Sequence, residues 1–406
     1  MKKRGLFFLL ITGLFLLLSA CAPQPAEPVA PEPAPPPTAQ PLSAIYVHGE
    51  SALIYAHASY GRRELFPHLE LWQGEEGPDF LWQEEEGINR GLLLWQIPPG
   101  EYSLRCGEDL LSVEEGLFLP EGYTITRNSR NLHWQFYRDA AGFLALRLEE
   151  VEQLPKDVYD ILIDPGHGGI DPGASGNGLV EAEQNLMAAQ YLAECFREMG
   201  LKVALSRHDA EIPGASWEED NPYAEGARVD QVYRKHAKYL LSSHLNAGGG
   251  SGFQLYSSLY TDSSWAAAVQ AELLASGWHG DENGLGWVEA ALYKRGSEKR
   301  SLIPRDYYFI IRETGGYALS PYNYRLFRID RHEELALGAE ALLLEYIFLD
   351  HAGDAEYWKK NWRELVAAVA AGSAEYWQLE EEPGLIGPGS SQPFPEGYTV
   401  PSETDE

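Results

Sequence analysis

The chain has 406 residues, of which 44% are hydrophobic and 23% are charged, so its composition excludes a wholly disordered protein and its length suggests about two domains. Its 61 acidic residues outnumber 31 basic ones and give a net charge of −30. Because such a chain repels phosphate backbones and has no basic stripe, we expect no nucleic-acid partner. Three cysteines are too few for a disulfide framework.

The first 20 residues have the pattern of an export signal. A basic start is followed by an apolar run, residues 6–18, which is too short to span a bilayer comfortably. The run ends in Leu18-Ser19-Ala20-Cys21, which resembles the lipobox of bacterial lipoproteins and implies cleavage before Cys21 and acylation of that residue. The alternatives are a plain signal peptide with a chance cysteine, or an N-terminal membrane anchor. We therefore expect an extracytoplasmic protein that is lipid-anchored to a bacterial membrane.

Three further regions differ from one another in composition. Residues 21–42 are rich in proline, which favours a semi-rigid polyproline II tether. Residues 43–150 contain short apolar runs separated by glycine and proline, which predicts a small all-β domain of unknown role. Residues 379–406 are acidic and rich in proline, glycine and serine, which predicts a disordered tail.

A different pattern runs through residues 156–378. A buried run ends in a glycine-rich segment that contains His167, a helical pattern follows over residues 181–200, and another apolar run leads directly into His244. This alternation predicts an α/β domain whose mixed or parallel sheet is flanked by helices. Such domains bind their ligands where strands end in glycine-rich loops.

Five short motifs follow one another through this region. In chain order they are Asp164–Ala174, Gly178–Glu181 leading to Asn185, Leu205–Arg207 with Asp209, Ser243–Ala247, and Leu342–Leu349 followed by a helix over residues 362–376. They resemble the motifs of the zinc-dependent N-acetylmuramoyl-L-alanine amidases, the type-3 cell-wall amidase family, and the resemblance covers about residues 159–377. It implies a hydrolase that cleaves the amide between N-acetylmuramic acid and L-alanine in peptidoglycan, with Zn²⁺ as its cofactor.

The metal ligands are expected to be His167, Glu181 and His244. A catalytic zinc takes three protein ligands, commonly two histidines and a carboxylate, and keeps one position open for water. Both histidines follow apolar strands at one sheet edge, and Glu181 begins the next helix. Glu183 competes with it, but the two point in different directions on a helix and the family register selects Glu181. The alternatives are structural histidines and an acidic residue that favours a helix N-terminus.

The catalytic base is expected to be Glu345. It lies in an apolar run, where a lone carboxylate is costly unless it is paired or functional. The family register favours a strand here, whereas a helix over residues 332–344 would make Glu345 a surface residue. Glu313 is the other candidate, although its segment, residues 310–314, is expected to form the strand before the catalytic one.

Two more residues have expected roles at the site. Arg312 corresponds to the family arginine, and it is expected to contact the substrate or a carboxylate, or to form a simple ion pair. Asn246, beside His244, orients substrate or caps its own loop. Cys106 and Cys195 fall in different expected domains and should be free thiols.

Residues 277–305 and 314–339 are longer than the family pattern needs. They are expected to fold over the cleft as a lid or a glycan-binding wall, or to have no role.

Two other functions stay open: a zinc peptidase that cuts within the stem peptide, and a catalytically silent wall-binding lipoprotein. Whether a protein activator is required is also open.

Overall fold

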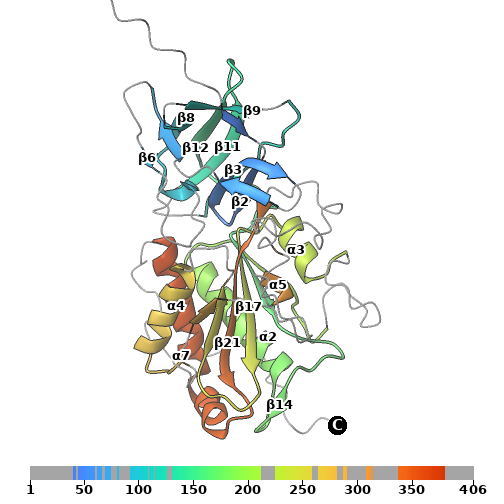
Figure 1. Ribbon diagram of the computed structural model, residues 1–406. Coiled ribbons are helices and arrows are strands. Elements are labelled where there is room, and N and C mark those ends of the chain that lie inside the picture. The colour runs from blue at the N-terminus through green and yellow to red at the C-terminus, as the bar shows by residue number, and fades with distance from the viewer. Residues whose placement is uncertain are drawn as a thin grey trace, which may run out of the picture. The chain divides into compact units, whose positions relative to one another are not determined.

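We describe a computed structural model of the chain (Figure 1). The signal segment, Cys21, the tether up to residue 39 and the tail from residue 380 lie outside the described residues. No helix within the described part is long and apolar enough to cross a membrane. The described residues are 40–42, 44–59, 62–65, 69–74, 80–81, 92–107, 109–113, 115–125, 130–211, 225–257, 264–280, 287–289, 308–311, 314 and 337–379.

The N-terminal part is built from two β-sheets, as the short apolar runs predict. Leu132, Trp134 and Phe136 alternate with more exposed residues along β11, so one face of this strand enters the core. The first sheet has the order β1-β9-β8-β12-β11-β10, with β5 on β8 and β6 on β5. Its strands are β1 (Gln40–Leu42), β5 (Leu69–Trp72), β6 (Phe80–Leu81), β8 (Gly100–Cys106), β9 (Asp109–Val113), β10 (Glu121–Tyr123), β11 (Asn131–Arg138) and β12 (Leu144–Val151).

The second sheet includes a strand from much later in the chain. Its order is β20-β2-β3-β4, with β7 also on β3, and the short 3-10 helix η2 (Leu94–Gln96) follows β7. Strand β20 pairs in parallel with β2, so the long stretch over residues 314–339 ends in the sheet of the N-terminal part. Its strands are β2 (Ala44–His48), β3 (Ser51–Ser59), β4 (Arg62–Leu65), β7 (Leu92–Leu93) and β20 (Leu337–Gly338).

The α/β part contains a six-stranded mixed sheet of order β16-β13-β17-β21-β18-β19. Strands β16, β13, β17 and β21 are parallel, whereas β18 is antiparallel to β21 and parallel to β19. This arrangement confirms the expected fold class. The strands are β13 (Ile161–Pro165), β16 (Val203–Leu205), β17 (Tyr239–Asn246), β18 (Gln254–Ser257), β19 (Trp287–Glu289) and β21 (Glu340–Phe348), and a separate hairpin joins β14 (Ser175–Gly176) to β15 (Leu179–Val180).

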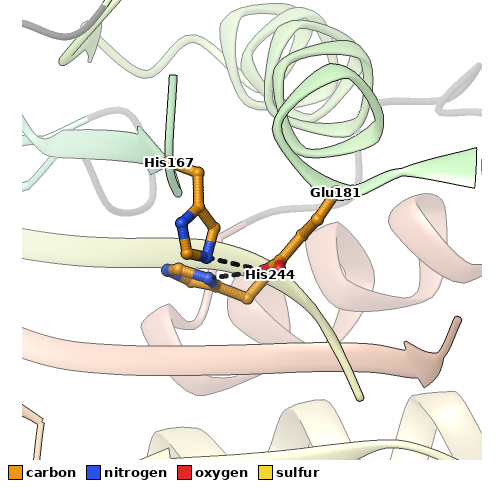
Figure 2. A group of neighbouring side chains, drawn as sticks. All are labelled: His167, Glu181 and His244. Carbon is orange, nitrogen blue, oxygen red and sulfur yellow. Dashed lines mark hydrogen bonds and ion pairs between the residues drawn. The ribbon is translucent and has the colours of Figure 1, made fainter. Parts of the chain in front are cut away.

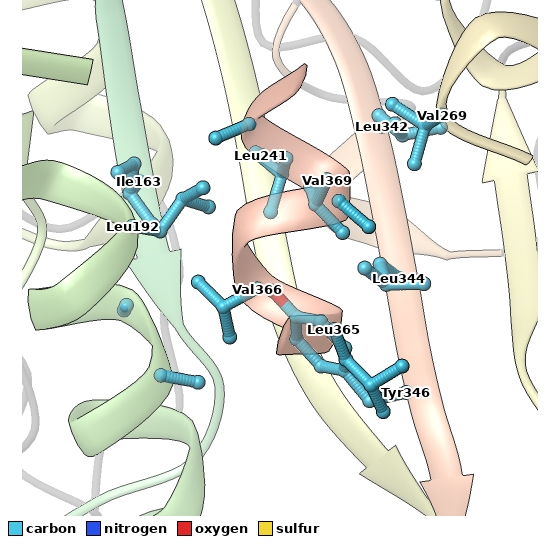
Figure 3. Close-up of a cluster of buried hydrophobic side chains, with 14 of the residues drawn as sticks. Ile163, Leu192, Leu241, Val269, Leu342, Leu344, Tyr346, Leu365, Val366 and Val369 are labelled. Carbon is cyan, nitrogen blue, oxygen red and sulfur yellow. The ribbon is translucent and has the colours of Figure 1, made fainter. Parts of the chain in front are cut away.

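Helices cover both faces of this sheet. On one face α2 (Glu181–Glu198), α4 (Ser264–Ala275) and α7 (Ala352–Trp377) bury the largest apolar cluster, in which Leu192 of α2 and Val366 of α7 meet strand residues such as Leu241 (Figure 3). On the other face α3 (Arg228–Arg234) and α5 (Phe309–Ile311) cover a smaller cluster.

The expected elements agree with these bounds except at one segment. The helix expected over residues 181–200 is α2, which ends at Glu198, and Gly200 follows it with a φ of +83°. The alternative of a helix over residues 332–344 is wrong for residues 340–344, because these residues belong to strand β21. The strand expected at residues 310–314 is also wrong, because Ile310 and Ile311 belong to α5 and β18 occupies the position beside β21. A short apolar run does not distinguish a buried helix from a strand.

We expect Gly372→Ala to destabilise the protein although alanine favours helices by about 1 kcal/mol over glycine. A Cβ at this position of α7 would lie 2.6 Å from the Cα of Val269 and 2.7 Å from the carbonyl oxygen of Ala268 in α4. Because the obstruction is backbone, the helices must separate, and such overpacking costs about 1–3 kcal/mol. Urea unfolding should therefore show a net loss of stability, whereas the exposed neighbour change Ala371→Ser should have little effect.

Candidate metal centre and active site

The candidate site lies at one edge of the six-stranded sheet. Strands β13, β17 and β21 run parallel, so their carboxyl ends meet at the same edge. His167 lies in the loop directly after β13, His244 lies near the end of β17, and Glu345 lies on β21 as the register partner of His244. The fold therefore brings together residues that are up to 178 positions apart in sequence.

Three of the expected residues form a compact group of metal-ligating atoms. Glu181 Oε1 lies 3.1 Å from His167 Nε2 and 3.0 Å from His244 Nδ1 (Figure 2). The three ligating atoms lie within 4.8 Å of one another, and no other such group of three occurs among the described residues. Two imidazoles and one carboxylate are a donor set that suits Zn²⁺.

The first turn of α2 decides between the two glutamates. Glu181 is 4% exposed, and its carboxylate also accepts a hydrogen bond from the backbone N–H of Ala174 at 2.9 Å. Glu183 is exposed to solvent. Its side chain is therefore placed away from the two histidines, and the geometry favours Glu181 as the carboxylate of the group.

Two glycines allow the close approach of these side chains. A Cβ at Gly166 would lie 2.1 Å from a ring carbon of His244, and a Cβ at Gly173 would lie 2.6 Å from the Glu181 carboxylate. Gly173 also has a φ of +67°, which favours glycine. His167 itself adopts a φ of +58°, an uncommon backbone conformation for a residue with a side chain.

The charges of the group are strongly coupled. Burial works against the charge of Glu181, but hydrogen bonds from His167 and His244 hold the pKa of this carboxylate well below its usual range. Burial would lower the pKa of His167, yet Glu181 and Asp171 raise it to about 9. The carboxylate is thus ionised and the imidazole retains a proton, which a metal cation would displace on binding.

Asp171 orients the ring of His167. Its Oδ2 lies 2.7 Å from His167 Nδ1, and its Oδ1 accepts a hydrogen bond from the backbone N–H of Gly173. This contact directs the opposite ring nitrogen, Nε2, toward Glu181. No role is expected for Asp171 from the sequence motifs, although its position four residues after His167 in the glycine-rich segment is a usable signal.

Two buried arginines hold the loop that carries His167. Arg207 donates hydrogen bonds to the backbone oxygens of Pro165 and Gly166 at 3.1 and 3.0 Å. Arg228 pairs with Asp164 and donates to the backbone oxygen of His167. Arg207 lies in a recognised motif, but Arg228 was missed because α3 follows a stretch with no motif.

Glu345 differs from Glu181 in its hydrogen bonding. It is 6% exposed, and its Oε2 has no hydrogen-bond partner among the described residues. Burial is the main reason that the pKa of Glu345 is raised to about 7, with His244 opposing the shift and Glu181 adding to it. A carboxylate with a pKa near neutrality is suited to exchanging protons.

The remaining expected residues fall into three cases. Asn246 lies beside the site, and its amide is engaged by Gln254 and by the backbone N–H of Ala247. Arg312 and Glu313 lie outside the described residues, as do most of the two long stretches. Cys106 and Cys195 are free thiols, as expected.

Comparisons with known proteins agree with the expected family. Residues 161–316 match a family model described as N-acetylmuramoyl-L-alanine amidase. The sporulation-specific N-acetylmuramoyl-L-alanine amidase of Bacillus subtilis (strain 168) is 38% identical over 104 residues, which is 25% of this chain and 36% of that protein. The N-acetylmuramoyl-L-alanine amidase CwlM of Bacillus licheniformis is 39% identical over 98 residues, which is 24% of this chain and 35% of that protein.

The chain thus spans about a third of the length of these two curated relatives. Among solved structures, the CwlD amidase from Clostridioides difficile in complex with the GerS lipoprotein is 21% identical, with a TM-score of 0.40 over 55% of this chain and 100% of that chain. The matched family region contains His167, Glu181 and His244 but ends before Glu345.

We expect Arg228→Met to destabilise the protein by about 3–5 kcal/mol, because it leaves the buried carboxylate of Asp164 without its cation. Burial alone would raise the pKa of Asp164, but Arg228 and Ser206 hold it below its ordinary value. This carboxylate therefore stabilises the wild-type fold above about pH 3.9, and the contribution is lost as pH falls through the lower pKa of the folded state.

In Arg228→Met the pKa of Asp164 shifts in the opposite direction. Burial then raises this pKa, and the folded state binds the proton more tightly than the unfolded state does. The deficit measured by urea unfolding should therefore be larger at pH 7 than at pH 4.5. Arg130→Met is the matched control and should stay close to wild type, because Arg130 and its ion-pair partner Glu150 are both exposed. An equal deficit at both pH values would contradict the role given to Asp164.

Proposed function

We propose that the protein is a zinc-dependent N-acetylmuramoyl-L-alanine amidase that hydrolyses the amide between N-acetylmuramic acid and L-alanine in bacterial peptidoglycan. The observation that carries the proposal is the group of His167, Glu181 and His244 beside the buried carboxylate of Glu345, one oxygen of which has no hydrogen-bond partner among the described residues. The matched family model and the amidase relatives support the same reaction.

His167, Glu181 and His244 would hold the zinc ion. Two nitrogen donors and one oxygen donor are a common catalytic set, and it leaves a position open for water and substrate. When bound, zinc polarises the scissile carbonyl and makes water acidic enough to lose a proton near neutral pH. Asp171 fixes the tautomer of His167, so that Nε2 is the nitrogen available to the metal.

Glu345 serves as the general base and then as the general acid. It takes a proton from the attacking water, holds it on a buried carboxyl group and delivers it to the nitrogen of the departing L-alanine. Burial makes the protonated form accessible near neutral pH, which a fully solvated glutamate would not achieve. Glu181 stays ionised in the same cleft because two imidazoles face it.

The other expected residues have supporting roles in this proposal. Arg312 contacts the substrate, and Asn246 orients it. Acylated Cys21 anchors the enzyme to the membrane, so the protein acts outside the cytoplasm on the wall.

Glu345→Gln should lower kcat by about 10²- to 10⁴-fold while zinc binding stays near one ion per chain, because the carboxylate is the base and not a ligand. Purified peptidoglycan is digested and the products are identified by mass. Wild type should release intact stem peptides with a free L-alanine amino group, and the exposed control Glu183→Gln should match it. Stems cut internally would identify a peptidase instead, and full activity in Glu345→Gln would refute this base.

Asp171→Asn should weaken zinc binding by about 10- to 100-fold, because it removes the charge that orients His167 and increases its basicity. Competition with a chelator gives the affinity, and added zinc should restore activity. Asp209→Asn is the matched control, since within the described part of the chain the Asp209 side chain accepts a hydrogen bond from the backbone N–H of nearby Glu211 alone. Unchanged zinc affinity in Asp171→Asn would show that this contact does not support a metal ligand.

A further inference from the structure

A glutamine that no motif singled out lies directly beside the proposed base. In β-sheet register Glu345 is paired with His244 of β17 on one side and with Gln254 of β18 on the other. Directly paired residues project from the same face of a sheet. His244, Glu345 and Gln254 therefore form one row across three strands, with the base in the middle.

The neighbouring row of paired residues identifies the face of the sheet on which Glu345 and Gln254 lie. Ser242 and Leu343 lie two positions earlier on β17 and β21, and Tyr256 lies two positions later on the antiparallel β18, again in register. Leu343 belongs to the apolar cluster on the α3 and α5 side, and Tyr256 packs against that cluster. Gln254 thus lies on the α3 and α5 side of the sheet together with Glu345.

The orientation of the Gln254 amide is set by a chain of hydrogen bonds. The backbone N–H of Ala247 can only donate, and it lies 2.8 Å from Asn246 Oδ1. Asn246 must then use Nδ2 as its donor, and this atom lies 2.7 Å from Gln254 Oε1. The hydroxyl of Tyr256 donates to the same oxygen, also at 2.7 Å.

Because both of these groups donate to Oε1, the orientation of the Gln254 amide is fixed. The other atom of the amide is the nitrogen Nε2. This nitrogen carries two N–H groups, so it can serve a protein acceptor and a substrate oxygen together. The ring of Tyr256 is itself held in an edge contact with Tyr308, with centroids 4.8 Å apart. The row therefore presents an oriented hydrogen-bond donor beside the base.

We propose that Gln254 binds the stem peptide by donating a hydrogen bond from Nε2 to the carbonyl oxygen of the departing L-alanine. This inference rests on the proposed amidase function. Glu345 must reach water on the side of His244 and must also reach the departing nitrogen. The peptide beyond that nitrogen then extends over the opposite side of Glu345, which is where Gln254 lies.

In this arrangement Asn246 and Tyr256 are positioning residues, because they act on the substrate through Gln254. The contact exists in the bound substrate as well as in the transition state, so its loss should change KM more than kcat. If Gln254 had a purely structural role, its replacement would change stability but would not change KM more than kcat.

The test uses Gln254→Met in the full chain, because methionine has a similar size and no N–H donor. Soluble glycan fragments carrying L-alanyl-D-glutamate stems are compared with fragments in which ethylamine replaces the peptide and removes the carbonyl. We expect KM for the peptide substrate to rise roughly 3- to 10-fold with little change in kcat. On the ethylamide substrate the variant and wild type should have the same KM.

Two further variants complete the design. Tyr256→Phe removes one donor that holds Gln254 and should raise KM in the same direction but less. Gln135→Met makes the same chemical change on β11, far from the site in sequence and in a different sheet, and should leave KM unchanged.

Unchanged KM in Gln254→Met, an equal rise on both substrates, or a fall in kcat alone would overturn the inference. Wild-type release of intact stem peptides separates this result from a failure of the proposed function. If wild type releases none from either substrate or from peptidoglycan, the amidase proposal is wrong and the assignment of Gln254 is overturned with it.

Discussion

The carboxylate of Glu181 is buried between two imidazoles, and the organisation of the sheet edge follows from keeping its charge stable there. A buried carboxylate is costly unless cations or hydrogen bonds compensate it. His167 and His244 supply that compensation, and the backbone N–H of Ala174 adds to it. Each of these groups needs the glycine-rich loop to pass close to α2, which explains the glycines at positions 166 and 173.

Two glutamates at one edge of the sheet behave in opposite ways because their partners differ. Glu181 faces two imidazoles, so its pKa is held well below its usual range. One oxygen of Glu345 has no hydrogen-bond partner among the described residues, and burial raises the pKa of this carboxyl group to about 7. Such a divergence separates a permanently charged ligand from a group that can carry a proton.

The support for this edge extends well beyond the metal-ligating group. Arg207 and Arg228 hold the backbone of the loop after β13, and Arg228 also neutralises buried Asp164. At the opposite end of β21, the chain continues from β20, which pairs with β2 of the N-terminal part. The N–H of Gly49 donates to the oxygen of Gly338 at 2.7 Å, just before β21 begins. The N-terminal sheet therefore contacts the start of the strand that carries Glu345.

Much of the α/β part could be predicted because its signals are local. A buried strand followed by a glycine-rich turn, and then a helix with an apolar face, is visible within some 40 residues of sequence. The same pattern placed His167 and His244 at strand ends, and the family register chose Glu181 and Glu345. The strand expected at residues 310–314 was wrong, because a short apolar run is equally compatible with a helix that buries one of its faces.

The sequence by itself determined which residue types could form the metal centre and which fold class would carry them, since periodicity and motif spacing are properties of neighbouring residues. Only the tertiary structure decided which distant groups complete the site. Arg228, Gln254 and β20 reach their positions through sheet order and register, and each lies at least 60 residues from its partner Asp164, Glu345 or β2. Pairing across such separations is set by the packing of the whole domain, and no local pattern in the chain encodes it.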